Sequence, residues 1–292
     1  LLLWSIVILS VILVAFGLPI FILLASLAIF FFLSEPTDWA TNYDLISTIS
    51  DSAYRIVVSP TLAAIPIFTL AGYILAESKI SDRLIKFFKA SLGWLPGSTV
   101  LIVVILCSFF TALTGGSGVT ILALGAILYP ILVHDGYTKR FSLGIITTAG
   151  SLGLLFPPSL PAIIYSVTAG INPLELFRQA LIPAIFLMSI MFFYGLYMLP
   201  KNKKIQKFNF NDAFNSAKIA KWEIAIPLLI IISLFSGFAT LVESAALLVL
   251  YVLTVELYIF KDVSFKDLPK IIIDCSTLVG GCLLYTSPSP RD

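Results

Sequence analysis

Long apolar runs, separated by short stretches of charged and polar residues, dominate this sequence. Most of these runs reach or exceed the roughly 18–20 residues that a helix needs to cross a bilayer. A water-soluble domain would interrupt such runs with charged positions. The pattern therefore predicts an all-α polytopic membrane protein. The runs without Asp, Glu, Lys or Arg are 1–34, 56–76, 90–134, 141–174, 179–199 and 224–242.

The composition supports this class and narrows the functions that remain. The chain has 292 residues, of which 59% are apolar and 12% are charged, against roughly 45–50% apolar and about 25% charged residues in soluble domains. A formal net charge of +2 gives no basis for nucleic-acid binding. The three cysteines show no paired spacing, so neither a disulfide nor a metal centre is predicted.

The distribution of charge predicts the orientation of the chain. Basic residues mark cytoplasmic loops, and here they cluster at 79–89, 139–140, 201–221 and 261–270. The segment 34–60 instead carries Glu35, three aspartates and a single arginine. We therefore expect this segment and the N-terminus on the periplasmic side.

The first part of the chain is expected to form three helices and an amphipathic helix. The segment 1–33 is too long for one upright helix, and Gly17-Leu18-Pro19 predicts a turn within it. Ser59 and Pro60 are typical of a helix start and predict a helix over 60–77. The amphipathic helix over 80–93 is expected to lie along the interface, as a plain connector or as an arm that transmits motion. Its polar side carries Lys79, Arg83, Lys86 and Lys89.

The charge-free run 90–134 starts and ends beside basic loops, so it contains an even number of crossings or none. Its two apolar pieces flank Thr114-Gly-Gly-Ser-Gly118. Each would rise only about 22–24 Å, against a hydrocarbon core of about 30 Å. We therefore expect a re-entrant helical hairpin over 97–134 whose tip lies near the middle of the bilayer. Two complete, tightly connected crossings are the alternative.

The run 141–174 is too long for one straight helix, and Phe156-Pro-Pro-Ser-Leu-Pro161 divides it. We expect a single discontinuous crossing over 141–171. Asn172 and Pro173 are expected to cap the next element, and a helix over 179–199 then returns to the cytoplasmic side.

The rest of the chain is expected to begin a second series of helices. A basic cytoplasmic loop is predicted over 200–221, and further membrane helices over 222–281. The residues 282–292 interrupt an apolar segment with two prolines and polar residues. We expect this tail to be an artefact of sequence assembly.

Two irregular backbone segments are thus expected at membrane depth, at Thr114–Gly118 and at Phe156–Ser159. Lipid cannot satisfy backbone N–H and C=O groups, so such segments line protein or a polar cavity, and we expect these two to face each other. The end of the first hairpin helix offers carbonyl oxygens to a cation, and the start of the second offers N–H groups to an anion. Pro157 and Pro158 lack N–H groups and leave carbonyls without donors near Leu154 and Leu155. Ser159 is expected to cap the second half-helix, which begins at Pro161.

Hydroxyl and carbonyl oxygens of this kind suit Na⁺ without any buried carboxylate. The predicted Na⁺ ligands are Thr114, Gly115, Ser117, Leu154, Phe156 and Pro158. The predicted substrate-binding residues are Gly116, Ser117, Gly118, Val119 and Ser159.

Other polar residues favour structural roles. Thr240 and Glu243 match a capping box that starts a helix. Glu256 is one turn from a predicted helix end, so its carboxylate is expected to reach the interface. His134 is the single histidine and lies beside Asp135 in a predicted loop. A membrane enzyme is the competing class, but the spans contain no HExxH, no paired aspartates and no serine with a His or Lys base, so no catalytic residue is predicted.

Several groups of residues form a pattern that extends over the whole chain. They are Ile65-Pro-Ile-Phe-Thr-Leu-Ala-Gly72, Gly115-Gly-Ser-Gly118, Tyr129-Pro130 with Asp135-Gly-Tyr137, Ala149-Gly150 with Gly153-Leu-Leu-Phe-Pro-Pro-Ser159, and Gly237-Phe-Ala-Thr240 with Glu243-Ser-Ala-Ala246. Together they resemble the large, DctM-like membrane subunit of tripartite ATP-independent periplasmic (TRAP) transporters. The resemblance covers about residues 1–281, and Ser244 stands where the family more often has Ala.

The resemblance implies a Na⁺-coupled importer of organic acids, such as dicarboxylates or sialic acid, in the bacterial inner membrane. It implies an inverted-repeat, elevator-type fold, a periplasmic substrate-binding protein that delivers the substrate, and a small four-helix membrane subunit. The first repeat would span 1–199. The second would begin near 222 and stop within its third helix, so we expect a truncated second repeat and no transport by the chain as written. A divalent-anion/Na⁺ symporter without a binding protein is the alternative, and neighbouring genes would decide between the two.

Overall fold

The computed structural model describes residues 58–199, 209–237 and 239–284, together with single positions between 17 and 54. The chain divides into two units, Pro60–Cys275 and the pair of terminal segments Leu1–Ser59 and Ser276–Asp292. Gly17 lies in a turn with φ +85°, as its sequence context predicts. The remaining predictions for 1–50 lie outside the described residues.

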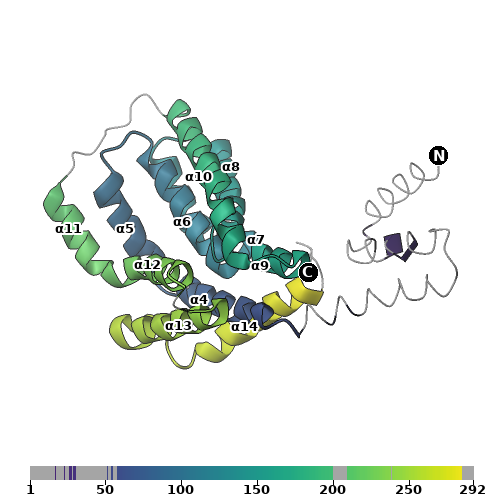
Figure 1. Ribbon diagram of the computed structural model, residues 1–292. Coiled ribbons are helices and arrows are strands. Elements are labelled where there is room, and N and C mark those ends of the chain that lie inside the picture. The colour runs from purple at the N-terminus through teal and green to yellow at the C-terminus, as the bar shows by residue number, and fades with distance from the viewer. Residues whose placement is uncertain are drawn as a thin grey trace, which may run out of the picture. The chain divides into compact units, whose positions relative to one another are not determined.

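The described part of the chain is helical and contains no strand (Figure 1). Its first half comprises η1 (Pro60–Ala63), α4 (Ala64–Glu77), α5 (Ile80–Leu92), α6 (Ser98–Thr114), α7 (Ser117–His134), α8 (Lys139–Leu152), η2 (Gly153–Leu155), α9 (Leu160–Ala169) and α10 (Pro173–Tyr197). Its second half comprises α11 (Phe210–Ile219), α12 (Lys221–Phe235), α13 (Leu241–Leu253), the π-helical segment η3 (Thr254–Phe260) and α14 (Leu268–Leu284).

Among the described residues, five helical segments are long and apolar enough to cross a membrane, which confirms the polytopic all-α class. They are 60–77, 117–134, 139–169, 173–197 and 241–260. The helix α6 is apolar but shorter, at 17 residues. The helix α7 has 18 residues, more than its apolar piece predicts, because Ser117, Gly118 and His134 join it. The re-entrant course of this hairpin stays a prediction.

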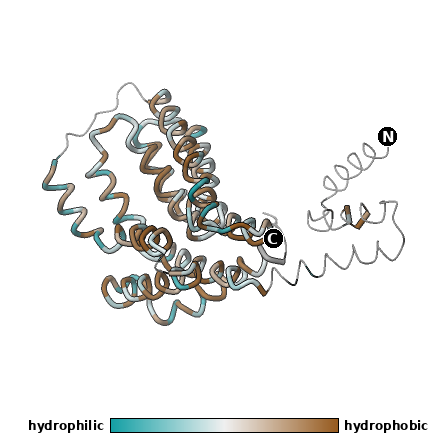
Figure 2. The backbone as a smooth tube through the Cα atoms, viewed as in Figure 1, coloured by the Kyte–Doolittle hydropathy of each residue, from teal (hydrophilic) through white to brown (hydrophobic). Residues whose placement is uncertain are grey.

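The helix α6 lies at the centre of the unit Pro60–Cys275. It packs against α4, α5, α7, α8 and α10, and α4 in turn packs along α13. Hydrophobic residues predominate in α6, α10 and α12, whereas α11 mixes hydrophilic and hydrophobic residues (Figure 2). Two glycines allow other helices to pack closely against α6. A Cβ added to Gly72 would lie 2.8 Å from Thr114 N, and a Cβ added to Gly195 would lie 2.6 Å from Val100 Cγ1.

Three element boundaries differ from the sequence prediction. The helix α10 begins at Pro173 instead of 179, because Asn172 Oδ1 accepts a hydrogen bond from Leu174 N (2.9 Å) and starts the helix before the apolar run. The predicted loop 200–221 contains the helix α11, which Asn209 caps and which packs against α5. The helix α14 extends to Leu284, so the first three residues of the predicted tail are helical. Residues 285–292 lie outside the described residues.

The capping box at the start of α13 is confirmed. Thr240 Oγ1 accepts from Glu243 N (3.3 Å), and Thr240 N donates to Glu243 Oε2 (2.8 Å). These two bonds satisfy backbone donors at the start of the helix.

One prediction about a charged residue is wrong. Glu256 does not extend out of the protein to the interface, because its side chain is fully buried against Arg83. Arg83, which the sequence assigns to the polar side of α5, has a side chain that is only 14% exposed and that forms ion pairs with Glu223, Glu256 and Asp262. We call these four residues the Arg83 cluster.

Candidate functional site

The hairpin tip is a two-residue connection between α6 and α7. Gly115 caps α6 with φ +69°, and its N–H donates to Thr111 O (2.9 Å). Gly116 is extended, and Ser117 begins α7. A left-handed φ of this kind strains any residue with a Cβ. The glycines therefore determine a sharp reversal of the chain.

The tip lies directly against the second helix break. A Cβ added to Gly115 would lie 2.8 Å from Leu160 Cβ, in the first residue of α9. A Cβ added to Gly150 in α8 would lie 3.5 Å from Ser117 O. The structure thus brings Gly115 and Ser117 next to the two halves of the broken helix.

The hydroxyls of two threonines meet at the carbonyl of Gly116. Thr114 Oγ1 lies at hydrogen-bond distance from Thr120 Oγ1 (3.1 Å), and Gly116 O is a more distant acceptor for either hydroxyl (3.5 and 3.4 Å). Both side chains are buried. They line a cavity of about 40 Å³ together with Ser78 and Ser81. Thr120 is absent from the sequence-predicted set, although it lies one turn after the tip.

The first turn of α7 carries backbone donors that no side chain caps. Ser117 and Val119 are half-buried and Gly118 is exposed. An α-helix N-terminus carries a partial positive charge and unpaired N–H groups, so it attracts carboxylates and other anions. The predicted substrate-binding residues of the hairpin thus share one helix end.

The second break is built from a 3₁₀ turn, two prolines and an N-cap. Phe156 N donates to Gly153 O (3.1 Å), and Pro157 and Pro158 have no N–H to continue the helix. Ser159 is fully buried, and its Oγ accepts from Ala162 N (3.3 Å) to start α9. The predicted cap at Ser159 is confirmed. The Ser159 hydroxyl oxygen thus already accepts a hydrogen bond from α9.

The helix α6 contacts this break through hydroxyl residues that the sequence prediction missed. A Cβ on Gly153 would lie 2.5 Å from Thr111 Cβ and 2.6 Å from Ser108 O, so the 3₁₀ turn touches α6 backbone. Ser108 Oγ and Thr111 Oγ1 are buried and have no hydrogen-bond partner among the described residues. Unpaired buried hydroxyls are costly, which makes these two oxygens candidate ligands for an ion. Their spacing with Thr114, at i, i+3 and i+6 on one helix, is the signal in the sequence.

The predicted ligands therefore form two groups. Thr114, Gly115 and Ser117 lie at the tip, beside α9 and α8. Phe156 and Pro158 line a separate cavity with Ser108. In the part of the chain that the structure describes, no hydrogen bond joins the tip to residues 154–158.

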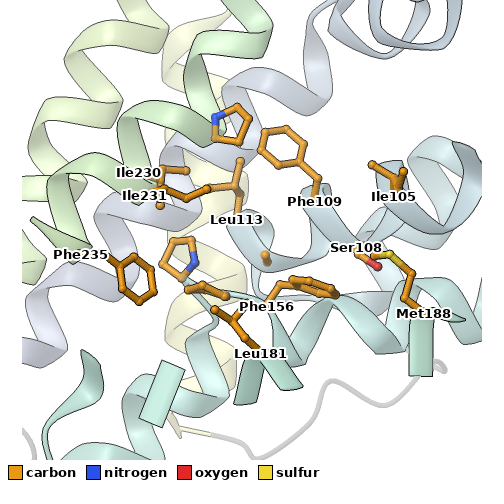
Figure 3. Close-up of a pocket in the computed structure, with 14 residues that line it drawn as sticks. Ile105, Ser108, Phe109, Leu113, Phe156, Leu181, Met188, Ile230, Ile231 and Phe235 are labelled. Carbon is orange, nitrogen blue, oxygen red and sulfur yellow. The ribbon is translucent and has the colours of Figure 1, made fainter. Parts of the chain in front are cut away.

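This separate cavity has a volume of about 490 Å³ and lies between α6, the Phe156–Pro158 segment, α10 and α12. Figure 3 shows Leu113 and Phe109 on one side and Phe156 on the other, with Phe235 of α12 beside them. Its lining is almost entirely apolar, and Ser108 is its one hydroxyl residue. A carboxylate would lose its hydration there without gaining partners. The N-terminus of α7 offers an anion more hydrogen-bond donors than this cavity does.

Comparisons with known proteins agree on one family. The family described as the tripartite ATP-independent periplasmic transporter, DctM component, matches residues 6–285. The chain is 31% identical to the C4-dicarboxylate TRAP transporter large permease protein DctM of Vibrio cholerae, over 86% of this chain and 55% of that protein. It is 28% identical to the ectoine TRAP transporter large permease protein TeaC of Halomonas elongata, over 72% and 50%. It is 27% identical to the isethionate TRAP transporter permease protein DctMQ of Oleidesulfovibrio alaskensis, over 79% and 37%. The chain thus spans about half the length of the curated relatives that it matches.

Proposed function

Because this chain belongs to the DctM family of tripartite ATP-independent periplasmic transporters, we propose that it is part of the large permease subunit of a Na⁺-coupled importer of organic acids. The observation that carries this proposal is the contact between the hairpin tip and the broken helix. That contact places an uncapped helix N-terminus and two unpaired hydroxyls within one region of a membrane protein. No such arrangement is needed for stability alone, since both features cost free energy when unfilled.

Coupling to Na⁺ is assigned to neutral oxygens. We propose neutral oxygens in both groups as Na⁺ ligands: those of Thr114, Gly115 and Ser117 at the tip, and those of Leu154, Phe156 and Pro158 at the helix break, as the sequence predicts. To the second group we add Ser108 and Thr111, which contact the 3₁₀ turn. All these groups are uncharged, so the ion can leave without exposing a buried carboxylate. A site of this kind combines binding with release.

The substrate is assigned to the first turn of α7, at Gly116, Ser117, Gly118 and Val119, with Ser159 positioning the start of α9. N–H groups at a helix end recognise the anionic group that organic acids share. The named relatives carry C4-dicarboxylates, ectoine and isethionate, so family membership leaves the individual substrate open. A C4-dicarboxylate or a sialic-acid-like carboxylate remains our proposal.

The partners follow from the tripartite family. We propose that a small four-helix membrane subunit binds the permease in the inner membrane, and that a periplasmic substrate-binding protein delivers the organic acid. The hairpin and broken helix would then move as a body through the bilayer, in an elevator mechanism. The genes next to this one are expected to encode both partners.

The test is uptake by proteoliposomes that contain the permease carrying this sequence, with its small subunit and binding protein. Uptake of a labelled organic acid is expected only with an inward Na⁺ gradient and with the binding protein present. Replacing Ser117 by Ala should raise the Na⁺ concentration for half-maximal uptake, whereas the exposed Ser151→Ala in α8 should leave it unchanged. Equal uptake with K⁺ in place of Na⁺ would contradict Na⁺ coupling.

A further inference from the structure

The Arg83 cluster joins three segments that are far apart in the sequence. Arg83 comes from α5, Glu223 from the first turn of α12, Glu256 from η3 and Asp262 from the loop after it. The guanidinium Nε donates to Glu223, Nη1 to Asp262 and Nη2 to Glu256. Among the described residues, the cluster thus attaches α5 to α12 and η3 through polar contacts.

The charges in this cluster do not balance. One guanidinium faces three carboxyl groups, and among the described residues no second Lys or Arg pairs with them. Fully ionised, the group would carry two excess negative charges. Glu223 and Glu256 have fully buried side chains, and Asp262 is 10% exposed. A buried charge without a partner costs far more than a neutral group, and like charges this close disfavour joint ionisation.

Two carboxylate oxygens in the cluster have no partner. Glu223 Oε2 and Glu256 Oε2 are buried and form no hydrogen bond among the described residues. Glu256 also makes the longest contact with the guanidinium, at 3.5 Å. An unpaired, buried carboxylate oxygen is the atom that gains most from a proton, because the neutral group is less costly to bury.

Among the described residues, the charged groups that act on Glu256 all belong to the cluster: Arg83, Asp262 and Glu223. Ser78 at the end of α4 contributes a neutral hydroxyl. The Phe260 ring centroid lies 3.8 Å from Arg83 Cζ, so an aromatic face covers the guanidinium. The nearby Tyr251 OH donates its hydrogen bond to Trp222 O (2.9 Å).

We propose that the Arg83 cluster is a proton-binding joint, which takes up one proton shared among its carboxyl groups and thereby attaches α5 to α12 and η3. The titration belongs to the group of residues, since the sites interact too strongly to ionise independently. Loss of the proton adds a negative charge beside two others and loosens the joint. The inference does not depend on the transport function, so either proposal can fail without the other.

The first experiment measures the thermal unfolding midpoint of the full chain in detergent between about pH 6 and 8.5, with choline chloride at constant ionic strength. A proton that is bound in the folded chain and released on unfolding stabilises the fold at low pH, and this stabilisation is lost as the pH rises. We expect the wild-type midpoint to fall by about 5 °C over this range. Glu256→Gln mimics the protonated group and should be nearly flat.

Asp82→Asn is the matched control, because Asp82 is an exposed carboxylate next to Arg83 on the same helix. It should retain the wild-type pH dependence. A second measurement counts protons directly: on unfolding at pH 7 in weak buffer, the wild-type chain should release one proton more than Glu256→Gln.

Two results would overturn the proposal. One is a wild-type midpoint that does not change with pH, or an unchanged pH dependence in both Glu256→Gln and Glu223→Gln. The other is a midpoint that rises when Na⁺ replaces choline at pH 8 in the wild type but not in Glu256→Gln, because the cluster would then bind a metal cation in place of the proton.

Discussion

The hairpin tip with its neighbouring helix break and the Arg83 cluster both bury polar atoms in an apolar protein, but they use different groups. At the tip and the break the polar atoms are backbone carbonyls, backbone N–H groups and hydroxyls, such as those of Ser108 and Thr111. In the Arg83 cluster they are four ionisable side chains. Neutral oxygens can bind and release an ion without leaving a bare charge, whereas a buried charged group is costly once its partner is removed.

This difference assigns the two regions different tasks. The hairpin tip and the neighbouring helix break, which we call the neutral region, are suited to reversible binding. Residues of the neutral region should affect ion dependence more than stability. The charged cluster is suited to joining helices, and its residues should affect stability more than ion dependence. Burial lowers the pKa of the Arg83 guanidinium, but its hydrogen bond to Asp262 and the charges of Glu223 and Glu256 together raise it above its ordinary value. Arg83 therefore stays charged over the pH range of the unfolding experiment.

The largest effect is expected from Arg83→Gln. The substitution leaves three carboxyl groups without a cation, and breaking a buried ion pair in this way costs about 3–5 kcal/mol. Thermal unfolding in detergent should show a large drop in midpoint that grows with rising pH. Lys86→Gln, at an exposed position on the same helix, should have little effect.

The double variant Arg83→Gln with Glu256→Gln sharpens this prediction. It removes one negative charge along with the positive one, so it should recover part of the lost stability. Equal stability of the single and double variants would contradict the charge argument.

The next largest effect is expected from Gly153→Ala, which acts on the neutral region through its shape. The added Cβ would lie 2.5 Å from Thr111 Cβ and 2.6 Å from Ser108 O, so α6 and the 3₁₀ turn must move apart. Overpacking of this kind costs about 1–3 kcal/mol. Gly144→Ala is the matched control on the preceding helix, because nothing lies within 4 Å of its added Cβ. Urea or thermal unfolding of both variants measures the difference.

The sequence predicted the neutral region better than the charged one, for a physical reason. Turns and caps depend on residues next to one another: the glycines of the tip, Pro157, Ser159 and the Thr240 capping box. These local signals were correct. The partners of Arg83 lie 140 to 179 residues away along the chain, so no local pattern indicates that they meet.

Two further features were hidden for other reasons. Ser108 and Thr111 lie in an apolar run, where a hydroxyl residue resembles a neutral filler, and only the packing of Gly153 against them shows their position. The helix α11 lies in a segment that its basic residues marked as a loop. Its N-cap at Asn209 is a local signal that the charge pattern concealed.

A smaller effect is expected from Ser159→Ala. Loss of the N-cap hydrogen bond to Ala162 N should cost about 1 kcal/mol, since Ser159 is buried and no water can replace it. Asn172→Ala removes the corresponding cap of α10 at an exposed position, so it is the control and should cost less. Hydrogen exchange of the first turn of α9 would locate the change. Unchanged exchange there would show that Ser159 does not act as a cap.

The smallest effect on stability, and the sharpest test of the comparison, is expected from Thr111→Val. Its hydroxyl is buried without a partner among the described residues, so replacing it by a methyl group of similar size loses no hydrogen bond and should leave stability unchanged or raise it by up to about 1 kcal/mol. Thr120→Val should instead lower stability, because the Thr120 hydroxyl bonds to Thr114 at 3.1 Å. In the reconstituted permease, however, Thr111→Val removes a proposed Na⁺ ligand and should raise the Na⁺ concentration for half-maximal uptake by about tenfold, which corresponds to roughly 1.4 kcal/mol. A variant with wild-type stability and altered Na⁺ dependence would show that the hydroxyl serves the ion. A variant with lowered stability and unaltered Na⁺ dependence would instead show that Thr111 has a structural role, as the residues of the Arg83 cluster do.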